Sequence, residues 1–252
     1  MPVALITGGS SGIGRAAALK LAKEGYSIHV TGRQEKALKD VQQECLKLGA
    51  PNVLFSLADL TEKDAPKSII DRTIEHFGSL DTLVNSAGIL VTGPVVDCDI
   101  EQYDKQMEVN VRSVVSVTRE ALPHLIKSKG TIVNVSSIAG PCPFPNVTYY
   151  CMSKAAIDQF TKCLALEMAP HGVRVNAVNP GVIKTEVHLR AGMDDEQYKA
   201  FLQKSKETHA LGRVGEVDEV AEAILFLASP KSSFTTGELL RVDGGRGIMF
   251  PR

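Results

Sequence analysis

The chain has 252 residues, with 28 lysines and arginines against 29 aspartates and glutamates, a net charge of −1 and 44% hydrophobic residues. This length suits one large globular domain, and the balanced charge gives no bias toward nucleic acid or anionic lipid as a partner. No apolar stretch approaches the roughly 20 residues that cross a bilayer, and the first expected strand leaves no room for a leader peptide, so we expect a cytoplasmic protein without a membrane partner.

Short apolar runs alternate with amphipathic stretches along the chain, which is typical of strand–helix–strand units around a parallel sheet. We expect strands at 3–7, 27–31, 53–57, 82–85, 131–136, 174–179 and 238–242. We expect helices at 12–23, 34–48, 63–77, 100–127, 150–169 and 217–228, with a polar helical segment at 186–211. Without an internal repeat or a linker, the pattern predicts one α/β domain over 1–252. Its fold would be a Rossmann-like, doubly wound parallel sheet with helices on both faces.

A glycine-rich turn, Thr-Gly-Gly-Ser-Ser-Gly-Ile-Gly at 7–14, lies between the first strand and the first helix. This order of strand, glycine turn and helix is what a dinucleotide site requires. Gly8 would allow a tight exit from the strand, Gly12 would let the backbone approach a pyrophosphate, and Gly14 would let the helix pack on the strand. The spacing is not the commoner Gly-x-Gly-x-x-Gly, and a lone glycine loop is about as often an ordinary turn.

Two hydroxyls and a tyrosine–lysine pair lie close together in the sequence. Ser136 and Ser137 end an apolar strand, and Tyr150 and Lys154 are four residues apart, on one face of a helix. A neighbouring ammonium group favours the phenolate, so we expect the pKa of Tyr150 to fall below its usual value of about 10, as suits a general acid for a carbonyl oxygen. Tyr149 competes for this role but has no lysine four residues later. By itself, such a pair is more often a surface contact.

Six features of the chain, in this order, resemble the motifs of the classical short-chain dehydrogenases/reductases. They are the loop at 7–14, Asn-Ser-Ala-Gly at 85–88, Asn110, Ser137, Tyr-x-x-x-Lys at 150–154 and Pro-Gly at 180–181. The resemblance covers residue 3 to about residue 245 and implies hydride transfer between a nicotinamide cofactor and a carbonyl or alcohol. It also implies the catalytic residues, which are Asn110, Ser137, Tyr150 and Lys154.

The resemblance assigns a role to each of these residues. Ser137 would hydrogen-bond the substrate carbonyl, with Ser136 pointing the other way, and Tyr150 would protonate the carbonyl oxygen. Lys154 would lower the phenol's pKa and bind the nicotinamide ribose, and Asn110 would hold a water that links Lys154 to solvent. The implied cofactor-binding residues are Gly8, Ser10, Ser11, Gly12, Ile13, Gly14, Arg33, Asp59, Leu60, Asn85, Ala87, Gly88, Tyr150, Lys154, Pro180, Gly181, Val182, Ile183 and Thr185.

The end of the second strand bears on the choice of cofactor. In dinucleotide folds an acidic residue there binds the ribose 2′-hydroxyl, and an arginine accommodates a 2′-phosphate. The resemblance places Gly32 at the acidic position, and Arg33 follows it, so we predict NADP(H); the alternative is that Arg33 only caps a loop. The resemblance gives Asp59 and the Leu60 backbone an adenine contact, although Asp59 could instead be a helix N-cap. Ser86 departs from the family, which usually has a second asparagine there.

Neither a disulfide framework nor a metal site is indicated. The number of cysteines, five, is odd, and no two of them are spaced as Cys-x-x-Cys. No two of the six histidines are spaced as His-x-x-x-His. We expect no metal cofactor.

Three segments should contact a small-molecule substrate: 89–95, the stiff and mostly apolar 139–147, and 186–211, which resembles the family's mobile lid. None contains an arginine cluster, which favours a ketone or 3-oxoacyl compound over a sugar phosphate. Lys184, Arg190 and Lys199 could still receive an acyl-carrier protein. The helices at 100–127 and 150–169 carry more apolar surface than one sheet face needs, and the resemblance implies a homotetramer, or a homodimer, built on them.

We therefore expect an NADPH-dependent carbonyl reductase, reversible as a secondary-alcohol dehydrogenase. A 3-oxoacyl-(acyl-carrier-protein) reductase is the alternative within the same class. A non-catalytic nucleotide-sensing module is the alternative of a different class, because fold alone does not fix function.

Overall fold

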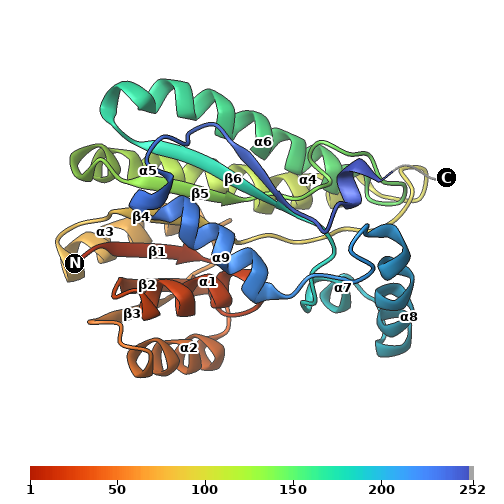
Figure 1. The fold of residues 1–252 in the computed structure, drawn as a ribbon, viewed down its shortest axis with the longest axis horizontal. Helices are drawn as coiled ribbons and strands as arrows, with labels where there is room; N and C mark the ends of the chain where they lie inside the picture. Colours follow the sequence, from red (N-terminus) through yellow and green to blue (C-terminus); the bar gives the residue numbers. More distant parts are fainter. Residues whose placement is uncertain (250–252) are drawn as a thin grey trace.

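The computed structural model describes residues 1–249 and is built on one parallel sheet (Figure 1). Its seven strands lie in the order β3-β2-β1-β4-β5-β6-β7, and every neighbouring pair is parallel. The predicted strands are confirmed, with bounds that differ by at most one residue at either end. They are β1 Val3–Thr7, β2 Ser27–Gly32, β3 Val53–Leu57, β4 Thr82–Asn85, β5 Thr131–Val135, β6 Arg174–Pro180 and β7 Leu239–Val242.

The predicted helices are confirmed in place. They are α1 Gly12–Lys23, α2 Glu35–Lys47, α3 Ala65–Phe77, α4 Ile100–Met107, α5 Ser113–Ser128, α6 Thr148–Met168, α7 Val187–Arg190, α8 Asp195–Ser205 and α9 Val217–Ala228. Two expectations need correction. The single helix expected at 100–127 is divided by a π-helical segment, Glu108–Arg112, and the segment at 186–211 forms two separate α-helices, α7 and α8.

Helices cover both faces of the sheet, as a doubly wound fold requires. Side chains alternate between the faces along each strand, so Ala4 and Ile6 point to one face and Leu5 to the other. The first face packs against α1, α2 and α9, and the second against α3, α5 and α6. Both clusters consist chiefly of buried aliphatic side chains, whose removal from water stabilises the fold.

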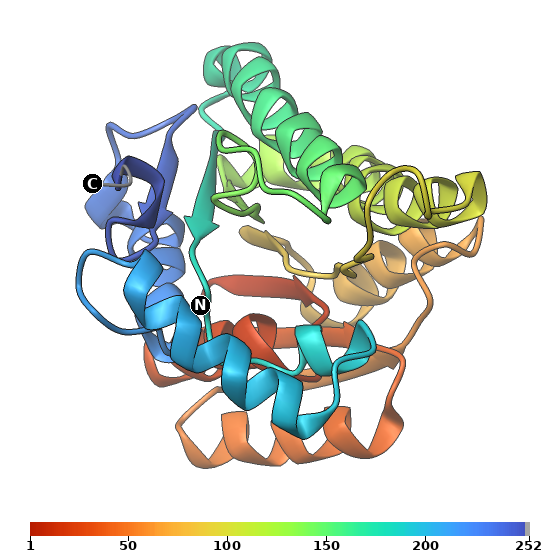
Figure 2. The same cartoon turned by 90° about the vertical axis from the view of Figure 1, so that its right-hand side faces the viewer.

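The strand order reverses direction at β1, which pairs with β2 on one side and β4 on the other. In open α/β sheets this switch point leaves a crevice outside the carboxyl ends of the strands, where ligands bind. The register places Thr7 opposite Asn85 at that edge. Figure 2 looks at the same edge and shows α7 and α8 lying in front of the strand ends.

The π-helical segment brings Asn110 to this edge. It begins directly after α4, and the hydroxyl of Ser113, the first residue of α5, donates to the Val109 carbonyl oxygen inside it at 2.6 Å. Single-turn π segments inside α-helices occur frequently at functional sites. Among residues 1–249, no helix is long and apolar enough to span a bilayer.

Candidate active site

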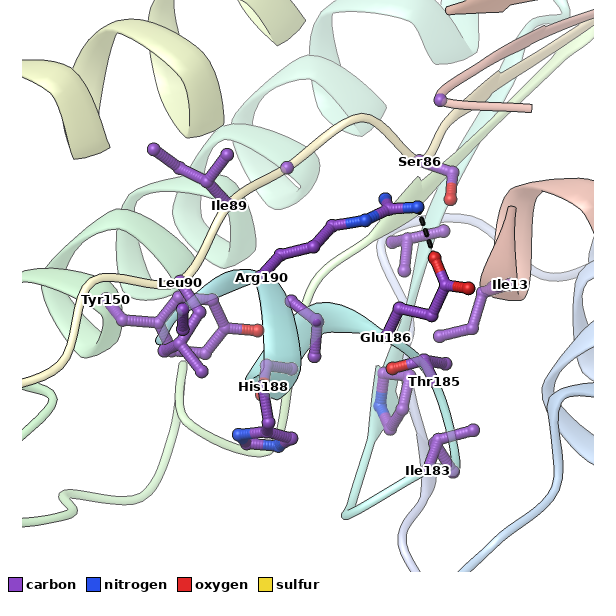
Figure 3. A pocket seen from close by; sticks show the side chains of 18 of the residues that line it. Ile13, Ser86, Ile89, Leu90, Tyr150, Ile183, Thr185, Glu186, His188 and Arg190 are labelled. Carbon is purple, nitrogen blue, oxygen red and sulfur yellow. Dashed lines mark hydrogen bonds and ion pairs between the residues drawn. The ribbon is translucent and has the colours of Figure 1, made fainter. Parts of the chain in front are cut away.

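A cavity of about 990 Å³ opens at the carboxyl edge of the sheet, between the strand ends and the segment at 180–208 (Figure 3). One end lies at Arg33 and Asp59, and the other at Tyr150 and Lys154. Eighteen of the predicted residues line it: Gly8, Ser10, Ser11, Gly12, Ile13, Arg33, Asp59, Leu60, Ala87, Gly88, Ser137, Tyr150, Lys154, Pro180, Gly181, Val182, Ile183 and Thr185. The other three predicted residues, Gly14, Asn85 and Asn110, lie behind its wall.

The glycine loop has the geometry that its sequence predicted. Gly8 and Gly12 adopt φ values of +63° and +54°, a region that other residues rarely enter. A Cβ on Gly8 would lie 2.8 Å from the Ala87 backbone, and one on Gly14 would lie 2.5 Å from the Gly8 carbonyl oxygen. Gly14 therefore lets α1 pack closely on the loop, although it does not itself face the cavity. The loop and the N-terminus of α1 form a backbone cradle that fits a pyrophosphate.

Ser137, Tyr150 and Lys154 come together at the far end of the cavity. The Lys154 Nζ atom lies 5.6 Å from the centre of the Tyr150 ring and donates to the Val135 carbonyl oxygen at 2.9 Å. The Ser137 side chain lies close enough to the Tyr150 phenol to influence its pKa. Tyr149 does not line the cavity and packs edge-on against Tyr103, with ring centres 5.4 Å apart. This excludes Tyr149 from the role that the sequence left open.

The pKa of Tyr150 differs from the expectation. Burial raises the phenol's pKa above its usual value, and the nearby Ser137 side chain offsets this only in part. Burial also lowers the pKa of Lys154 to about 8. The sequence argument counted the ammonium as a neighbour and did not count the desolvation of both groups. The phenol is therefore held in its protonated form at neutral pH, which is the form that donates a proton.

Asn110 and Asn85 act from behind the cavity wall. The Asn110 side chain accepts from the Ile89 N–H at 2.8 Å and donates to the Ile89 carbonyl oxygen at 2.9 Å, which ties the segment after β4 to the π-helical segment. A Cβ on Gly88 would lie 3.3 Å from the Asn110 Oδ1 and 3.8 Å from the Lys154 Nζ, so only a small residue separates the two groups. The Asn85 side chain is committed to the core, where its Nδ2 donates to the Asn134 Oδ1 at 2.9 Å.

A buried carboxylate that the sequence did not reveal supports the segment after β5 that carries Ser137. Asn179 donates to the Ser137 carbonyl oxygen at 2.8 Å and to both Asp158 oxygens at 3.1 Å. A Cβ on Gly140 would lie 2.0 Å from the Asp158 Oδ2, so the loop after Ser137 passes directly over this carboxylate. The Ser136 hydroxyl donates to the Lys154 backbone oxygen at 3.3 Å and so turns toward α6, as alternation along a strand predicts.

The other end of the cavity combines one arginine, one carboxylate and a glycine. Arg33 lies 3.7 Å from Asp59, whose pKa is lowered chiefly by hydrogen bonds from the Thr61 backbone and side chain. Because α3 begins at Ala65, Asp59 is not a helix N-cap. A Cβ on Gly32 would lie 3.0 Å from the Ser10 Oγ, so the serine hydroxyl takes up the space that a larger residue would need.

Several cavity residues were not among the individually named catalytic and cofactor residues. His188 and Arg190 come from α7, Phe144 comes from the loop after β5, and Arg246 follows β7. Arg190 reaches across the cavity toward the Ser86 side and pairs with Glu186, while Tyr150, Leu90 and His188 gather at the other end (Figure 3). Phe144, His188 and Arg190 lie in the segments 139–147 and 186–211 that were expected to contact the substrate, whereas the sequence analysis did not place Arg246 in the site.

Three features together define a dinucleotide-dependent oxidoreductase. They are the cleft at the switch point of a parallel sheet, the glycine cradle, and the cluster of Ser137, Tyr150 and Lys154. The family model described as "Enoyl-(Acyl carrier protein) reductase" matches residues 8–246. The chain belongs to the short-chain dehydrogenase/reductase family, whose members use NAD(P)(H) and act on alcohols and carbonyl compounds.

Relatives of known activity match over nearly the whole chain. Glucose 1-dehydrogenase of Gluconobacter oxydans is 38% identical over 96% of this chain and 90% of its own. The 3-oxoacyl-(acyl-carrier-protein) reductase of Thermotoga maritima is 37% identical over 96% of both chains. A solved short-chain dehydrogenase/reductase of unknown function from Caenorhabditis elegans, with cofactor, superposes with a TM-score of 0.93 at 36% identity, over 99% of this chain and 96% of that one.

Proposed function

We propose that this protein is an NADPH-dependent reductase that transfers a hydride to the carbonyl carbon of a ketone, and that it runs in reverse as a secondary-alcohol dehydrogenase. The observation that carries the proposal is the position of the Tyr150 phenol. It lies close to the Ser137 side chain and to Lys154, and it faces the cavity whose opposite end holds the glycine cradle. A buried acid at this position can protonate a substrate oxygen that gains negative charge during the reaction.

Each residue of the chain then has a defined part. Ser137 orients the carbonyl oxygen and stabilises its developing charge, and Tyr150 donates the proton. Lys154 supplies a positive charge next to the phenol and is anchored by the Val135 carbonyl. Asn110 is a positioning residue, because its side chain fixes Ile89; its link from Lys154 to solvent through a water is part of the proposal. The nicotinamide, when bound, supplies the hydride.

The proposed cofactor residues are the cavity-lining set together with Gly14 and Asn85, which shape the wall from behind. The preference for NADP(H) is supported at the Arg33 end of the cavity. No carboxylate stands at Gly32 to repel a 2′-phosphate, and the guanidinium of Arg33 is exposed at the cavity edge, where it can bind a phosphate through two N–H groups. Asp59 neutralises Arg33 only in part, because it also accepts two hydrogen bonds from Thr61.

The decisive experiment compares Tyr150→Phe with the wild type. We expect the variant to bind NADPH with an unchanged dissociation constant and to lose turnover by several orders of magnitude, because phenylalanine keeps the ring and removes the proton donor. Substrates for the assay come from a screen of NADPH oxidation over diketones, 3-oxoacyl thioesters, steroids and sugars. Wild-type turnover in Tyr150→Phe would assign the proton to another group, and NADPH binding without turnover of any carbonyl compound would favour a nucleotide-sensing module.

A 3-oxoacyl-(acyl-carrier-protein) reductase is the second candidate, and the relative from Thermotoga maritima favours it. Two of the three cations that would receive the carrier are already partnered, because Lys184 pairs with Glu216 and Arg190 pairs with Glu186. We therefore place this activity second. Reduction of a 3-oxoacyl group on an acyl-carrier protein at least tenfold more efficiently than on the free thioester would reverse that order.

We propose a homotetramer, with a homodimer as the smaller alternative, working in the cytoplasm. Large apolar side chains lie exposed on the two helical segments expected to pair: Ile100 on α4, Val115 on α5, and Met152 and Leu166 on α6. Exposed apolar side chains on neighbouring helices are typical of subunit interfaces. Light scattering at micromolar concentration tests the assembly, and a monomer would contradict it. The segment at 186–211 is proposed as a substrate lid because α7 and α8 lie in front of the strand ends.

A further inference from the structure

A half-buried arginine lies at the substrate end of the cavity, and the proposed reaction does not use it. Arg246 follows β7 and begins a short 3₁₀ turn, Arg246–Ile248, which brings its side chain into the cavity wall. Its guanidinium lies over the Phe144 ring, 4.8 Å from the ring centre. A cation–π contact of this kind does not use the N–H donors of the guanidinium as conventional hydrogen bonds.

The turn that carries Arg246 is fixed by a carboxylate that does not pair with it. The Asp243 side chain accepts from the Gly245 N–H at 2.9 Å and from the Gly247 N–H at 2.8 Å. Within residues 1–249, the Arg246 guanidinium has neither a carboxylate within 4.0 Å nor a hydrogen-bond acceptor. A guanidinium keeps its charge in proteins, so burying it without a partner is costly.

The carboxylates that line the cavity are paired with other arginines. Two carboxylates line the cavity. Asp59 lies within ion-pair distance of Arg33, and Glu186 lies within ion-pair distance of Arg190. Lys204, on α8 of the proposed lid, is a further cation that lines the cavity. The Asp243 charge acts on Arg246 but forms no ion pair with it. The dinucleotide phosphates would lie at the glycine cradle and at Arg33, so they do not account for Arg246, which approaches from the opposite wall beside Phe144.

We propose that Arg246 binds a carboxylate on the substrate, so that the substrates are oxo acids and the corresponding hydroxy acids. This inference rests on the proposed function and names its substrate class. The ketone would face Ser137 and Tyr150, and the carboxylate would bind the edge of the guanidinium. The apolar part between the two groups would lie along Ile89, Leu90 and Phe201, which also line the cavity. A planar guanidinium matches a carboxylate through two parallel hydrogen bonds, which gives orientation as well as affinity.

The test uses matched pairs of substrates. A series of linear oxo acids, from 3-oxobutanoate to 6-oxoheptanoate, is assayed with NADPH next to the methyl ester of each acid. We expect the best acid to exceed its ester in kcat/KM by at least tenfold, because the ester keeps the ketone and loses the charge. In Arg246→Met this preference should fall by 10- to 100-fold, with the loss mainly in KM, as for removal of a charged hydrogen-bond pair. Arg246→Lys should recover part of it.

Arg241→Met is the matched control, because Arg241 lies on β7, is exposed and does not line this cavity. We expect it to keep the wild-type preference for acids. An acid-to-ester ratio near one in the wild type, or a ratio that survives in Arg246→Met, would overturn the assignment.

A binding measurement separates this inference from the proposed reaction. Linear carboxylates without a ketone, from butanoate to heptanoate, are titrated into the protein by calorimetry. We expect binding that weakens about tenfold or more in Arg246→Met and not in Arg241→Met. If neither acids nor esters are reduced but this pattern holds, the proposed function fails and the anion site stands. If the esters are reduced and no carboxylate binds through Arg246, the anion site fails alone.

Discussion

The guanidinium of Arg190 donates a hydrogen bond to the Ser11 Oγ at 3.1 Å. The two residues are 179 positions apart in the sequence, and the bond joins α7 to the glycine loop. The same side chain pairs with Glu186 one helical turn earlier (Figure 3). Ser11 is the N-cap of α1, where the backbone cradle fits a pyrophosphate. The proposed lid therefore carries a positive charge to the position where the cofactor's negative charge would lie.

We expect Arg190→Gln to raise the dissociation constant for NADPH about tenfold, because a charge-assisted hydrogen bond to a phosphate is worth about 1.5–3 kcal/mol in sheltered positions and less where the pair is exposed. Titration of NADPH fluorescence measures this, and the loss should shrink at high salt. Arg112→Gln is the control, since Arg112 forms an exposed pair with Glu108 away from the cavity. Equal dissociation constants for Arg190→Gln and the wild type would show that Arg190 only bridges Glu186 and Ser11.

Cofactor preference should change with a single carboxylate at Gly32. In Gly32→Asp we expect the preference for NADPH over NADH to fall by about 100-fold or more, because the new carboxylate repels a 2′-phosphate and accepts from a ribose hydroxyl. The Ser10 hydroxyl, 3.0 Å from the new Cβ, has to rotate away. The ratio of the two dissociation constants is the readout, and Arg33→Ala should lower affinity for NADPH alone. A wild type that prefers NADH would contradict the prediction at once.

The sequence predicted the sheet well because its information is local. Each strand is a short apolar run between turn residues, and the strand–glycine–helix order at 3–23 fixes the cradle. The residues at strand ends then meet at one edge because parallel strands share it, so Ser137 and the glycine loop could be placed without a structure.

What the sequence did not predict depends on contacts distant along the chain. No glycine or proline interrupts residues 100–122, so the sequence gives no sign of the π-helical segment around Asn110 and indicates one continuous helix. Asp158 and Asn179 are 21 residues apart and become partners only when α6 packs beside β6. Arg246 reaches the cavity through the turn after β7 and belongs to none of the three segments expected to contact substrate. The direction of the Tyr150 pKa shift needed the burial of the phenol.

The alkaline limit of the proposed ketone reduction should report on the charge of Lys154. Its pKa is lowered to about 8 by burial, so the ammonium form is present below this pH and is lost above it. We expect kcat/KM for ketone reduction to be flat up to about pH 7 and to fall up to tenfold per pH unit above 8. The pKa of Tyr150 is raised, so the phenol itself stays protonated across this range. In Lys154→Arg, which cannot lose its charge, the limit should move to higher pH. A limit unchanged in that variant would belong to another group.

Acid sensitivity of the fold should arise from His29, which is fully buried on β2. Its Nδ1 lies 2.8 Å from the Thr73 Oγ1, and that hydroxyl donates to the Ile69 carbonyl oxygen, so His29 donates at Nδ1. Its Nε2 lies 2.7 Å from the Ser56 Oγ and accepts from it. Burial, with smaller contributions from Arg72 and His76, lowers the pKa of His29 to about 3. The unfolded chain takes up a proton below about pH 6.5 and the folded chain does not, so stability falls as the pH drops from 6.5 toward 3.

Between pH 7 and pH 5 this linkage amounts to about 2 kcal/mol in the free energy of unfolding. Urea unfolding at fixed protein concentration, followed by circular dichroism, measures it. His29→Gln should be less stable at pH 7, because glutamine does not reproduce both ring hydrogen bonds, but it should lose about 2 kcal/mol less than the wild type between the two pH values. His171→Gln, at an exposed position, should behave as the wild type. The same pH dependence in His29→Gln as in the wild type would place the acid-sensitive group elsewhere in the molecule.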